Sequence, residues 1–258
     1  MGELNNPSFN SVKSHGIKIS GNYVVRSAED IAEGWEALGS GKVPLMAEEW
    51  VDFEKEISVP VCRGINGEIK TFPAAETVRM NNIPDETTVP ARIGSEPVHA
   101  AMLIAEHCVN AFEACGTMCV EFFVEKSGRV LVSRLVPQPQ DSGNYTIEAC
   151  VTSQYEQHVR AVLGYPLGDT SLVRPAAVKN IIGDHEGHAF VHGLEKACAL
   201  PGVKVHIYGK TEVRKGRRMG HITATADTAE EALRLVREAH KFIYFTDAEN
   251  DLERIIKS

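Results

Sequence analysis

The chain has 258 residues, with 27 Lys and Arg against 35 Asp and Glu, so its formal net charge is −8. Hydrophobic residues make up 43% and charged residues 24%, a composition typical of soluble globular proteins that excludes intrinsic disorder and collagen-like repeats. The acidic balance argues against general nucleic-acid binding. No uncharged apolar run reaches the roughly 18 residues that a membrane-spanning helix needs.

The first half of the chain is expected to alternate short strands with two helices. Strands are predicted at 22–26, 44–50, 56–63 and 68–78. Ser27 and Asp30 form a capping pattern for a helix that ends at Gly39. The two prolines of 80–96 make that segment a predicted loop, and an apolar stripe at helical spacing predicts a second helix over 97–114.

The second half begins with a predicted hairpin. Two apolar runs, 117–125 and 129–137, are separated by Lys126-Ser127-Gly128, a short turn with glycine where positive φ is needed. Helices are expected over 146–163 and from the capping box at Thr228 to Phe245, with strands at 178–182, 203–208 and 220–225 and a short helix in the tail 246–258. This mixture of antiparallel hairpins and helices predicts an α+β fold.

The cysteines and the N-terminus indicate the compartment. The six cysteines include no CxxC pair and lie mostly among apolar neighbours, which favours reduced, buried thiols. The first residues lack the basic start and apolar run of a signal peptide. We therefore expect a cytoplasmic protein.

Three long stretches carry a resemblance to a known family. They are SGNYTIEACVTSQYEQHVRAVLGYPLG at 142–168, LPGVKVHIYGK at 200–210 running into RKGRRMGH at 214–221, and AEEWVDFEKEISV at 47–59 joined to GEIKTFPAAET at 67–77. In these residues the chain resembles the carboxyaminoimidazole ribonucleotide synthetases, ATP-grasp enzymes of purine biosynthesis. That family couples ATP cleavage to the carboxylation of aminoimidazole ribonucleotide by bicarbonate, through a carboxyphosphate intermediate.

The resemblance implies an ATP-grasp fold without the family's N-terminal domain and with a small C-terminal α/β subdomain. On this basis residues 1–60 are a remnant of the ATP-grasp lid, 61–183 are the ATP-grasp core, and 184–258 are the C-terminal subdomain. Because family members are commonly dimers, a homo-oligomer or a subunit of a larger assembly is expected.

The resemblance also implies two ligand sites. Glu48 and Glu56 match the family's adenine and ribose contacts, with Val51 in the backbone hinge between them, so ATP is the expected cofactor. Lys210 and Arg217 match the residues that hold the ribonucleotide phosphate, to which their point charge and planar guanidinium are suited. For Glu48 and Glu56 the alternative is a pair of surface carboxylates beside a strand turn. For Lys210 and Arg217 the alternative is a solvated basic turn.

The metal position departs from the family pattern. Glu121 matches one magnesium ligand, but Arg134 stands where the family has the second, and Ser133 replaces a neighbouring Asn. The hairpin should place Glu121 opposite residue 133 or 134, a bulge at Gly128 deciding which, so we expect a Glu121–Arg134 ion pair. A magnesium site of the family type is therefore doubtful.

Other substrate positions differ as well. Ile17-Lys18-Ile19-Ser20 stands at the family's Tyr-Asp-Gly-Arg motif, and Gln138, Gln140 and Asp141 replace its Arg, His and Asn. Separately, His185, His188 and His192 could face one way on a helix and hold a transition metal, although a variable loop is the simpler interpretation.

Two hypotheses follow from this pattern. The favoured one is a degenerate, non-catalytic family member that acts as a binding, regulatory or structural subunit. The alternative is an active ATP-dependent carboxylase or ligase of purine biosynthesis whose missing domain comes from a partner chain. Retained Glu121, Lys210 and Arg217 support the alternative, whereas Arg134 opposes it.

Overall fold

The computed structural model describes residues 23–42, 44–80 and 83–247, and the chain forms two compact units, 1–52 and 53–258. In the first unit, helix α1 (Asp30–Ala37) confirms the predicted helix. The Asp30 carboxylate accepts hydrogen bonds from the backbone N–H groups of Arg26 and Ser27, at 2.7 and 3.0 Å, and so fixes the turn that leads into the helix, whose N-cap residue Glu29 makes no side-chain cap. The predicted strands are not formed: 23–26 is irregular, and 44–50 contains a single bridge residue.

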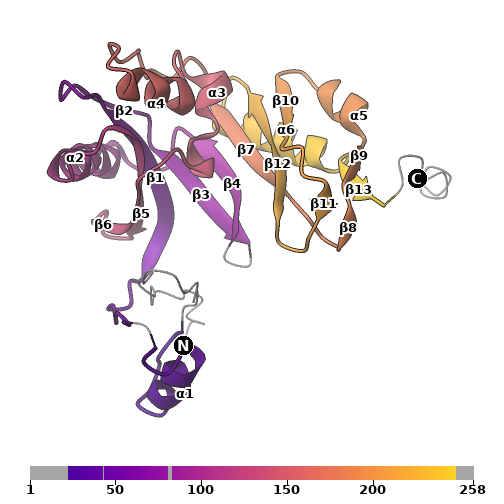
Figure 1. The fold of residues 1–258 in the computed structure, drawn as a ribbon. Coiled ribbons are helices and arrows are strands. Elements are labelled where there is room, and N and C mark those ends of the chain that lie inside the picture. The colour runs from indigo at the N-terminus through magenta and orange to yellow at the C-terminus, as the bar shows by residue number, and fades with distance from the viewer. Residues whose placement is uncertain (1–22, 43, 81–82, 248–258) are drawn as a thin grey trace. The chain divides into compact units, whose positions relative to one another are not determined.

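The second unit is built on one antiparallel sheet (Figure 1), whose described strands run in the order β10-β12-β7-β4-β3-β1-β5-β6, with β2 paired to β1. The strands are β1 (Phe53–Arg63), β2 (Ile69–Thr71), β3 (Ala75–Met80), β4 (Ile83–Val89), β5 (Gly116–Glu125), β6 (Val130–Val136), β7 (Ala176–Ile182), β10 (Val203–Ile207) and β12 (Arg218–Thr225). Strand β4 joins the two ends of the sheet, because it pairs with both β3 and β7.

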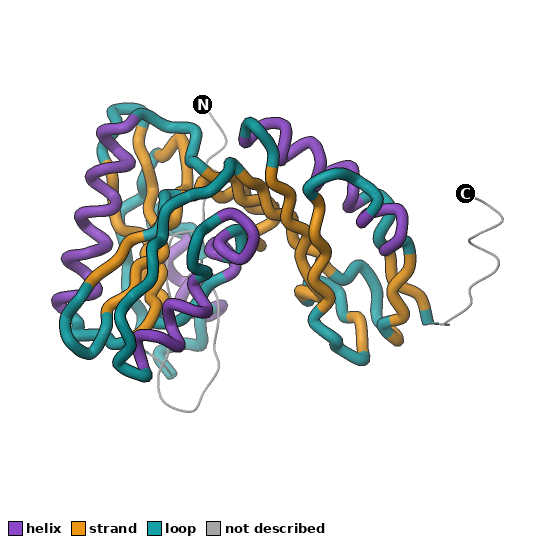
Figure 2. The backbone as a smooth tube through the Cα atoms, turned by 90° about the horizontal axis from the view of Figure 1, so that it is seen from above, coloured by secondary structure: helices purple, strands orange, loops and turns teal. Residues whose placement is uncertain are grey.

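Helices cover this sheet at both ends, as Figure 2 shows. Helix α2 (Ser95–Ala111) packs on β1 and β5, and α6 (Ala229–His240) packs on β7 and β12. The remaining elements are η1 (Asp141–Gly143), α3 (Thr146–Ala149), α4 (Gln154–Val162), α5 (Leu194–Cys198) and the short strands β8 (Gly187–His188), β9 (Phe190–His192), β11 (Glu212–Val213) and β13 (Tyr244–Thr246). Each end of the sheet therefore has its own apolar core.

The alternation of β1 decides which face becomes the polar one. Ile57, Val59 and Val61 are 1% exposed or less and belong to the core under α2. Because side chains alternate along a strand, Glu56 and Ser58 point to the opposite face. Ser58 is paired with Glu121 of β5, and Glu121 with Arg134 of β6, so this face carries a row of polar groups across neighbouring strands.

Several element predictions are corrected. The segment 80–96 is not a loop, since it contains β4. The helix expected over 146–163 is two helices, because the backbone is extended at Cys150 and Ser153 starts α4 by accepting a hydrogen bond from Glu156 N–H at 3.1 Å. The last helix ends at His240 instead of Phe245. The strand expected over 68–78 is interrupted between β2 and β3.

The remaining predictions are confirmed or lie outside the described residues. The hairpin at 117–137 forms β5 and β6, and the predicted helix over 97–114 is α2. The six cysteines form no disulfide, although Cys115 and Cys198 are exposed. Within 23–42, 44–80 and 83–247, no helix is both long and apolar enough to cross a membrane. The lid segment 17–20 and the tail helix fall outside those ranges apart from 246 and 247.

Candidate functional site

The polar face of the sheet opens into a cavity of about 280 Å³. Its walls come from the sheet strands β1, β3, β4, β5, β6 and β12 and from the η1 segment. The charged side chains that line it are Arg79, Glu121, Arg134, Asp141 and Arg218. The cavity therefore brings together residues from both ends of the second unit.

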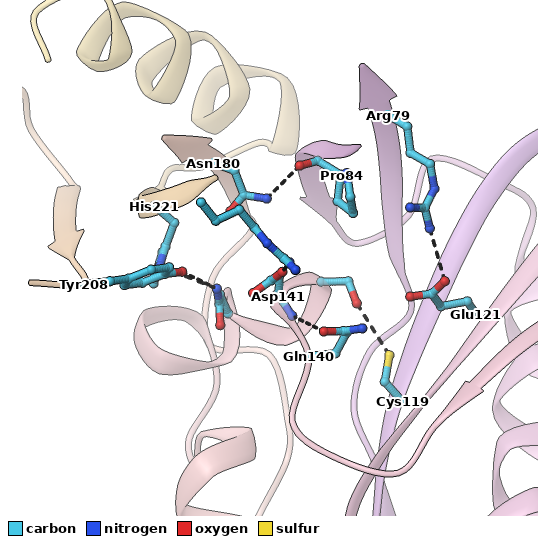
Figure 3. A network of polar contacts seen from close by, with 12 residues as sticks. Arg79, Pro84, Cys119, Glu121, Gln140, Asp141, Asn180, Tyr208 and His221 are labelled. Carbon is cyan, nitrogen blue, oxygen red and sulfur yellow. Dashed lines mark hydrogen bonds and ion pairs between the residues drawn. The ribbon is translucent and has the colours of Figure 1, made fainter. Parts of the chain in front are cut away.

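Glu121 is bound by a residue that the sequence analysis did not single out. Arg79 of β3 donates to Glu121 at 3.1 Å and to Glu56 at 2.6 Å. One guanidinium therefore bridges a carboxylate of β1 and a carboxylate of β5. Figure 3 shows Arg79 pointing at Glu121. The predicted register is confirmed, because Glu121 pairs with Arg134, with the irregularity lying between Glu121 and Phe122 instead of at Gly128. The predicted Glu121–Arg134 ion pair is wrong, since the partner of Glu121 is Arg79.

The η1 segment places Asp141 on the other side of the cavity. Gln154 is fully buried; its side-chain oxygen accepts from Gln140 N–H at 3.1 Å and its amide donates to the Gln140 carbonyl at 2.7 Å. A Cβ atom at Gly143 would lie 2.3 Å from that same oxygen, so a larger residue there would displace the Gln154 amide from these hydrogen bonds. Asp141 forms an ion pair with Arg218 of β12. The altered residues Gln140 and Asp141 are thus held in defined positions.

A polar cluster lies beside Asp141 (Figure 3), in which Asn144 and His221 are buried. The Tyr208 hydroxyl lies 2.9 Å from Nδ1 of His221, and Asn144 accepts from the Tyr155 hydroxyl at 2.6 Å and lies within 3.5 Å of both Tyr208 and His221. Burial, and to a lesser extent His206 stacked on it at 4.4 Å, lowers the pKa of His221 to about 3. His221 is therefore neutral at physiological pH.

This low pKa predicts a loss of stability in mild acid. In the unfolded chain His221 takes up a proton near pH 6.5, but in the folded chain only near pH 3. Stability from this group is complete above pH 6.5 and falls as the pH drops below it, by about 2 kcal/mol between pH 7 and 5. His206 and Tyr208 are the titratable groups that lie against it, and Glu148 lies 2.7 Å from His206 on the far side of that ring.

Urea denaturation at pH 7 and pH 5 measures the effect. We expect His221→Phe to reduce the pH dependence of the unfolding free energy by about 2 kcal/mol, whereas the exposed His99→Gln should leave it as in the parent. Equal pH dependence in His221→Phe and the parent would contradict the prediction. Part of the slope will remain in every variant, because burial also lowers the pKa of His240.

The two residues predicted to bind a phosphate are brought together. Lys210 follows β10 and Arg217 precedes β12. The Lys210 ammonium donates to the Arg218 carbonyl and lies 5.7 Å from the centre of the Tyr208 ring. Burial, followed by the charge of Arg217, lowers the pKa of Lys210. Arg217 donates to the Glu212 carbonyl at 3.0 Å. Their role in binding phosphate stays a prediction.

The residues predicted to bind ATP are divided between the two units. Glu48 and Val51 belong to the first unit, where both are partly buried, and Glu56 belongs to the second, where Arg79 binds it. The two units are described separately, so a single adenosine site formed by all three residues stays a prediction. The pairing of Glu56 with Arg79 is a contact that sequence spacing did not indicate, since 23 positions separate the two residues.

The described residues do not fit a magnesium site of the family type. Glu121 already binds Arg79, Asp141 already binds Arg218, and the residue paired with Glu121 is Arg134. In the part of the chain that the structure describes, no group of three His, Cys, Asp or Glu could hold a metal ion. His188 and His192 lie on β8 and β9, so the helical arrangement that their spacing allowed is not formed.

Family models match most of the chain. A model of the ATP-grasp domain matches residues 3–155, and a model of the phosphoribosylaminoimidazole carboxylase C-terminal domain matches residues 176–235.

Curated relatives are similar over most of this chain but are longer. N5-carboxyaminoimidazole ribonucleotide synthase of Bacillus subtilis is 39% identical over 221 residues, which cover 86% of this chain and 57% of that protein. Phosphoribosylaminoimidazole carboxylase of Saccharomyces cerevisiae is 38% identical, over 82% of this chain and 38% of that one. The chain thus spans little more than half the length of the first relative.

Solved structures have the same fold. N5-carboxyaminoimidazole ribonucleotide synthetase from Thermotoga maritima superposes with a TM-score of 0.77 at 34% identity, over 95% of this chain and 69% of that one. N5-carboxyaminoimidazole synthase from Aspergillus clavatus, in complex with ADP and 5-aminoimidazole ribonucleotide, gives a TM-score of 0.80 at 32% identity, over 93% and 62%. These proteins are all named as enzymes, so the comparisons favour the catalytic alternative over the non-catalytic hypothesis.

Proposed function

Because the chain belongs to the N5-carboxyaminoimidazole ribonucleotide synthetase family of ATP-grasp proteins, we propose that it supplies the nucleotide- and substrate-binding part of an ATP-dependent ligase that carboxylates aminoimidazole ribonucleotide. The observation that carries the proposal is the match of both domains to relatives named for this reaction, one of them solved with ADP and the ribonucleotide. The chain spans 57% of the Bacillus relative, so the activity of the whole protein is part of this proposal.

Specific residues are assigned to the two ligands. Glu48, Val51 and Glu56 contact the adenosine of ATP, and Lys210 and Arg217 hold the phosphate of the ribonucleotide. Lys210 and Arg217 both lie in the segment that joins β10 to β12, which supports the second assignment, because paired cations of this kind suit a phosphate. In this proposal the lid remnant is 1–60, the ATP-grasp core 61–183 and the C-terminal subdomain 184–258.

A second candidate function is binding of the same ligands without turnover. The observation that favours it is the arginine at the second metal position, together with the bond of Arg79 to Glu121. A carboxylate that already binds a guanidinium is a poor ligand for magnesium, which requires well-placed oxygen ligands. On this reading the chain is a regulatory or structural subunit, and homo-oligomer formation remains a proposal for both candidates.

One experiment separates the two candidates. The chain is assayed with magnesium-ATP, bicarbonate and aminoimidazole ribonucleotide, alone and with the N-terminal segment of the Bacillus relative added in trans. ADP formation that depends on the ribonucleotide, and that is lost in Lys210→Ala, supports the ligase. Calorimetric binding of ATP and of the ribonucleotide without turnover supports the second candidate. If neither ligand binds, both are wrong.

A further inference from the structure

The cavity on the polar face carries more positive than negative side chains. Three arginines, Arg79, Arg134 and Arg218, line it together with two carboxylates, Glu121 and Asp141. Arg79 is bound by Glu121 and by Glu56 outside the cavity, and Arg218 is bound by Asp141. Within the described ranges, Arg134 has neither a carboxylate partner nor a hydrogen-bond acceptor. The cavity therefore holds one guanidinium whose charge is not balanced.

The spacing of the arginines adds a second observation. Burial lowers the pKa of Arg218, and the charges of Arg134 and Arg79 lower it further. All three arginines line the same cavity, so their charges repel one another, and an anion bound among them would relieve that repulsion. A divalent cation in the same place would add to the repulsion, and both cavity carboxylates are already engaged.

A buried hydroxyl group belongs to the cavity wall. Thr77 is 6% exposed and lines the cavity, and among the described residues its hydroxyl oxygen has no hydrogen-bond partner. Buried hydroxyl groups are normally paired, so an unpaired one at a cavity wall indicates that a ligand or solvent completes it. Thr77 and Arg79 both stand on β3, and both line the cavity.

From these observations we propose that the cavity binds a phosphate group directly and without a divalent cation. In this proposal the Arg134 guanidinium takes the place that a metal ion would otherwise have. A planar guanidinium can bind two phosphate oxygens at once, and the Thr77 hydroxyl can donate a further hydrogen bond. The identity of the ligand rests on the proposed function, which offers a nucleotide or a ribonucleotide phosphate, whereas the metal independence does not.

Calorimetry with simple phosphate ligands tests the proposal on the full chain. Inorganic phosphate, ADP and ribose 5-phosphate are titrated in excess EDTA and again in excess Mg²⁺. We expect at least one of them to bind in EDTA, and ADP against ribose 5-phosphate distinguishes the two sources of the phosphate. Arg134→Gln should weaken binding in EDTA by about tenfold or more, because it removes one charge-assisted contact.

Arg129→Gln is the matched control, since Arg129 lies just before β6, is 67% exposed and does not line the cavity. It should bind phosphate within about twofold of the parent. The proposal is wrong if all three ligands bind more weakly than about 10 mM in EDTA, if binding appears only with Mg²⁺, or if Arg134→Gln binds as the parent does. A negative ligase assay leaves these results unaffected, so the two proposals fail separately.

Discussion

Glu86→Gln is expected to lower the free energy of unfolding by about 3 kcal/mol, because it removes one charge from a buried ion-pair network. Glu86 is 7% exposed and accepts from Arg237 of α6 at 2.8 and 2.7 Å and from Lys179 of β7 at 3.2 Å. These bonds join α6 to strands β4 and β7. The variant would leave Lys179, itself 9% exposed, with Asp85 alone.

The pKa of Glu86 gives the direction of the accompanying pH effect. Burial raises it, but the hydrogen bonds and charges of Arg237 and Lys179 outweigh burial and hold the pKa below its ordinary value. The stabilisation is therefore present above the pKa of the unfolded carboxyl and is lost as the pH falls through the folded value. Glu86→Gln should remove this part of the acid sensitivity.

Urea denaturation measures the change, with Glu238→Gln as the control. Glu238 lies on the same helix in an exposed pair with Arg234, at 3.2 Å. Exposed pairs of this kind contribute a few tenths of a kcal/mol, so the control should stay within about 0.5 kcal/mol of the parent. Losses of equal size in the two variants would show that burial of Glu86 has no special effect.

The fold was predictable from sequence where local signals agree with the tertiary structure. The hairpin between β5 and β6 has a short glycine turn between two apolar runs, and both features survive in the folded chain. Strand β4 was missed because Pro84 and Pro90 flank a short β-branched run. Pro84 is tolerated there because the β3–β4 register shifts next to its partner Arg79. Tertiary pairing with β3 and β7 then overrides the local signal.

The break between α3 and α4 had a readable signal. Ser153 and Glu156 have the spacing of a helix start, and the structure uses it. The continuous apolar and polar pattern across 146–163 concealed that start. Leu172 pairs with Cys150 as an isolated bridge, a contact over 22 positions that no local pattern encodes. The interruption was therefore predictable in principle at Ser153 but not at Cys150.

The pairing of site residues was predictable within one hairpin, but the ion pairs between strands that are far apart in the sequence were not. The hairpin register and alternation placed Glu121 opposite Arg134, and the structure agrees. The ion pair went instead to Arg79, which precedes Glu121 by 42 positions and reaches it across the sheet. The same holds for Asp141 and Arg218, which meet only because β4 joins the two ends of the sheet. Contacts of this range depend on the packed fold.

Arg134→Glu is the variant with the largest expected effect on ligand binding. It replaces a positive charge by a negative one at the cavity wall, beside Glu121. At an effective dielectric constant of about 20 and a separation of about 5 Å, each unit of charge contributes about 3 kcal/mol to the interaction with a monoanion. Arg134 is exposed, so solvent reduces the total. We still expect phosphate affinity in EDTA to fall by about a hundredfold or more.

Magnesium should recover part of that loss, and only in this variant. Two carboxylates on paired positions, together with phosphate oxygens, are the kind of hard oxygen ligands that Mg²⁺ binds. Arg134→Gln should show no such recovery, since it supplies no second carboxylate, and Arg129→Glu controls for charge outside the cavity. Calorimetry of ADP with and without Mg²⁺ measures all three. Affinity within tenfold of the parent in EDTA would contradict the role assigned to Arg134.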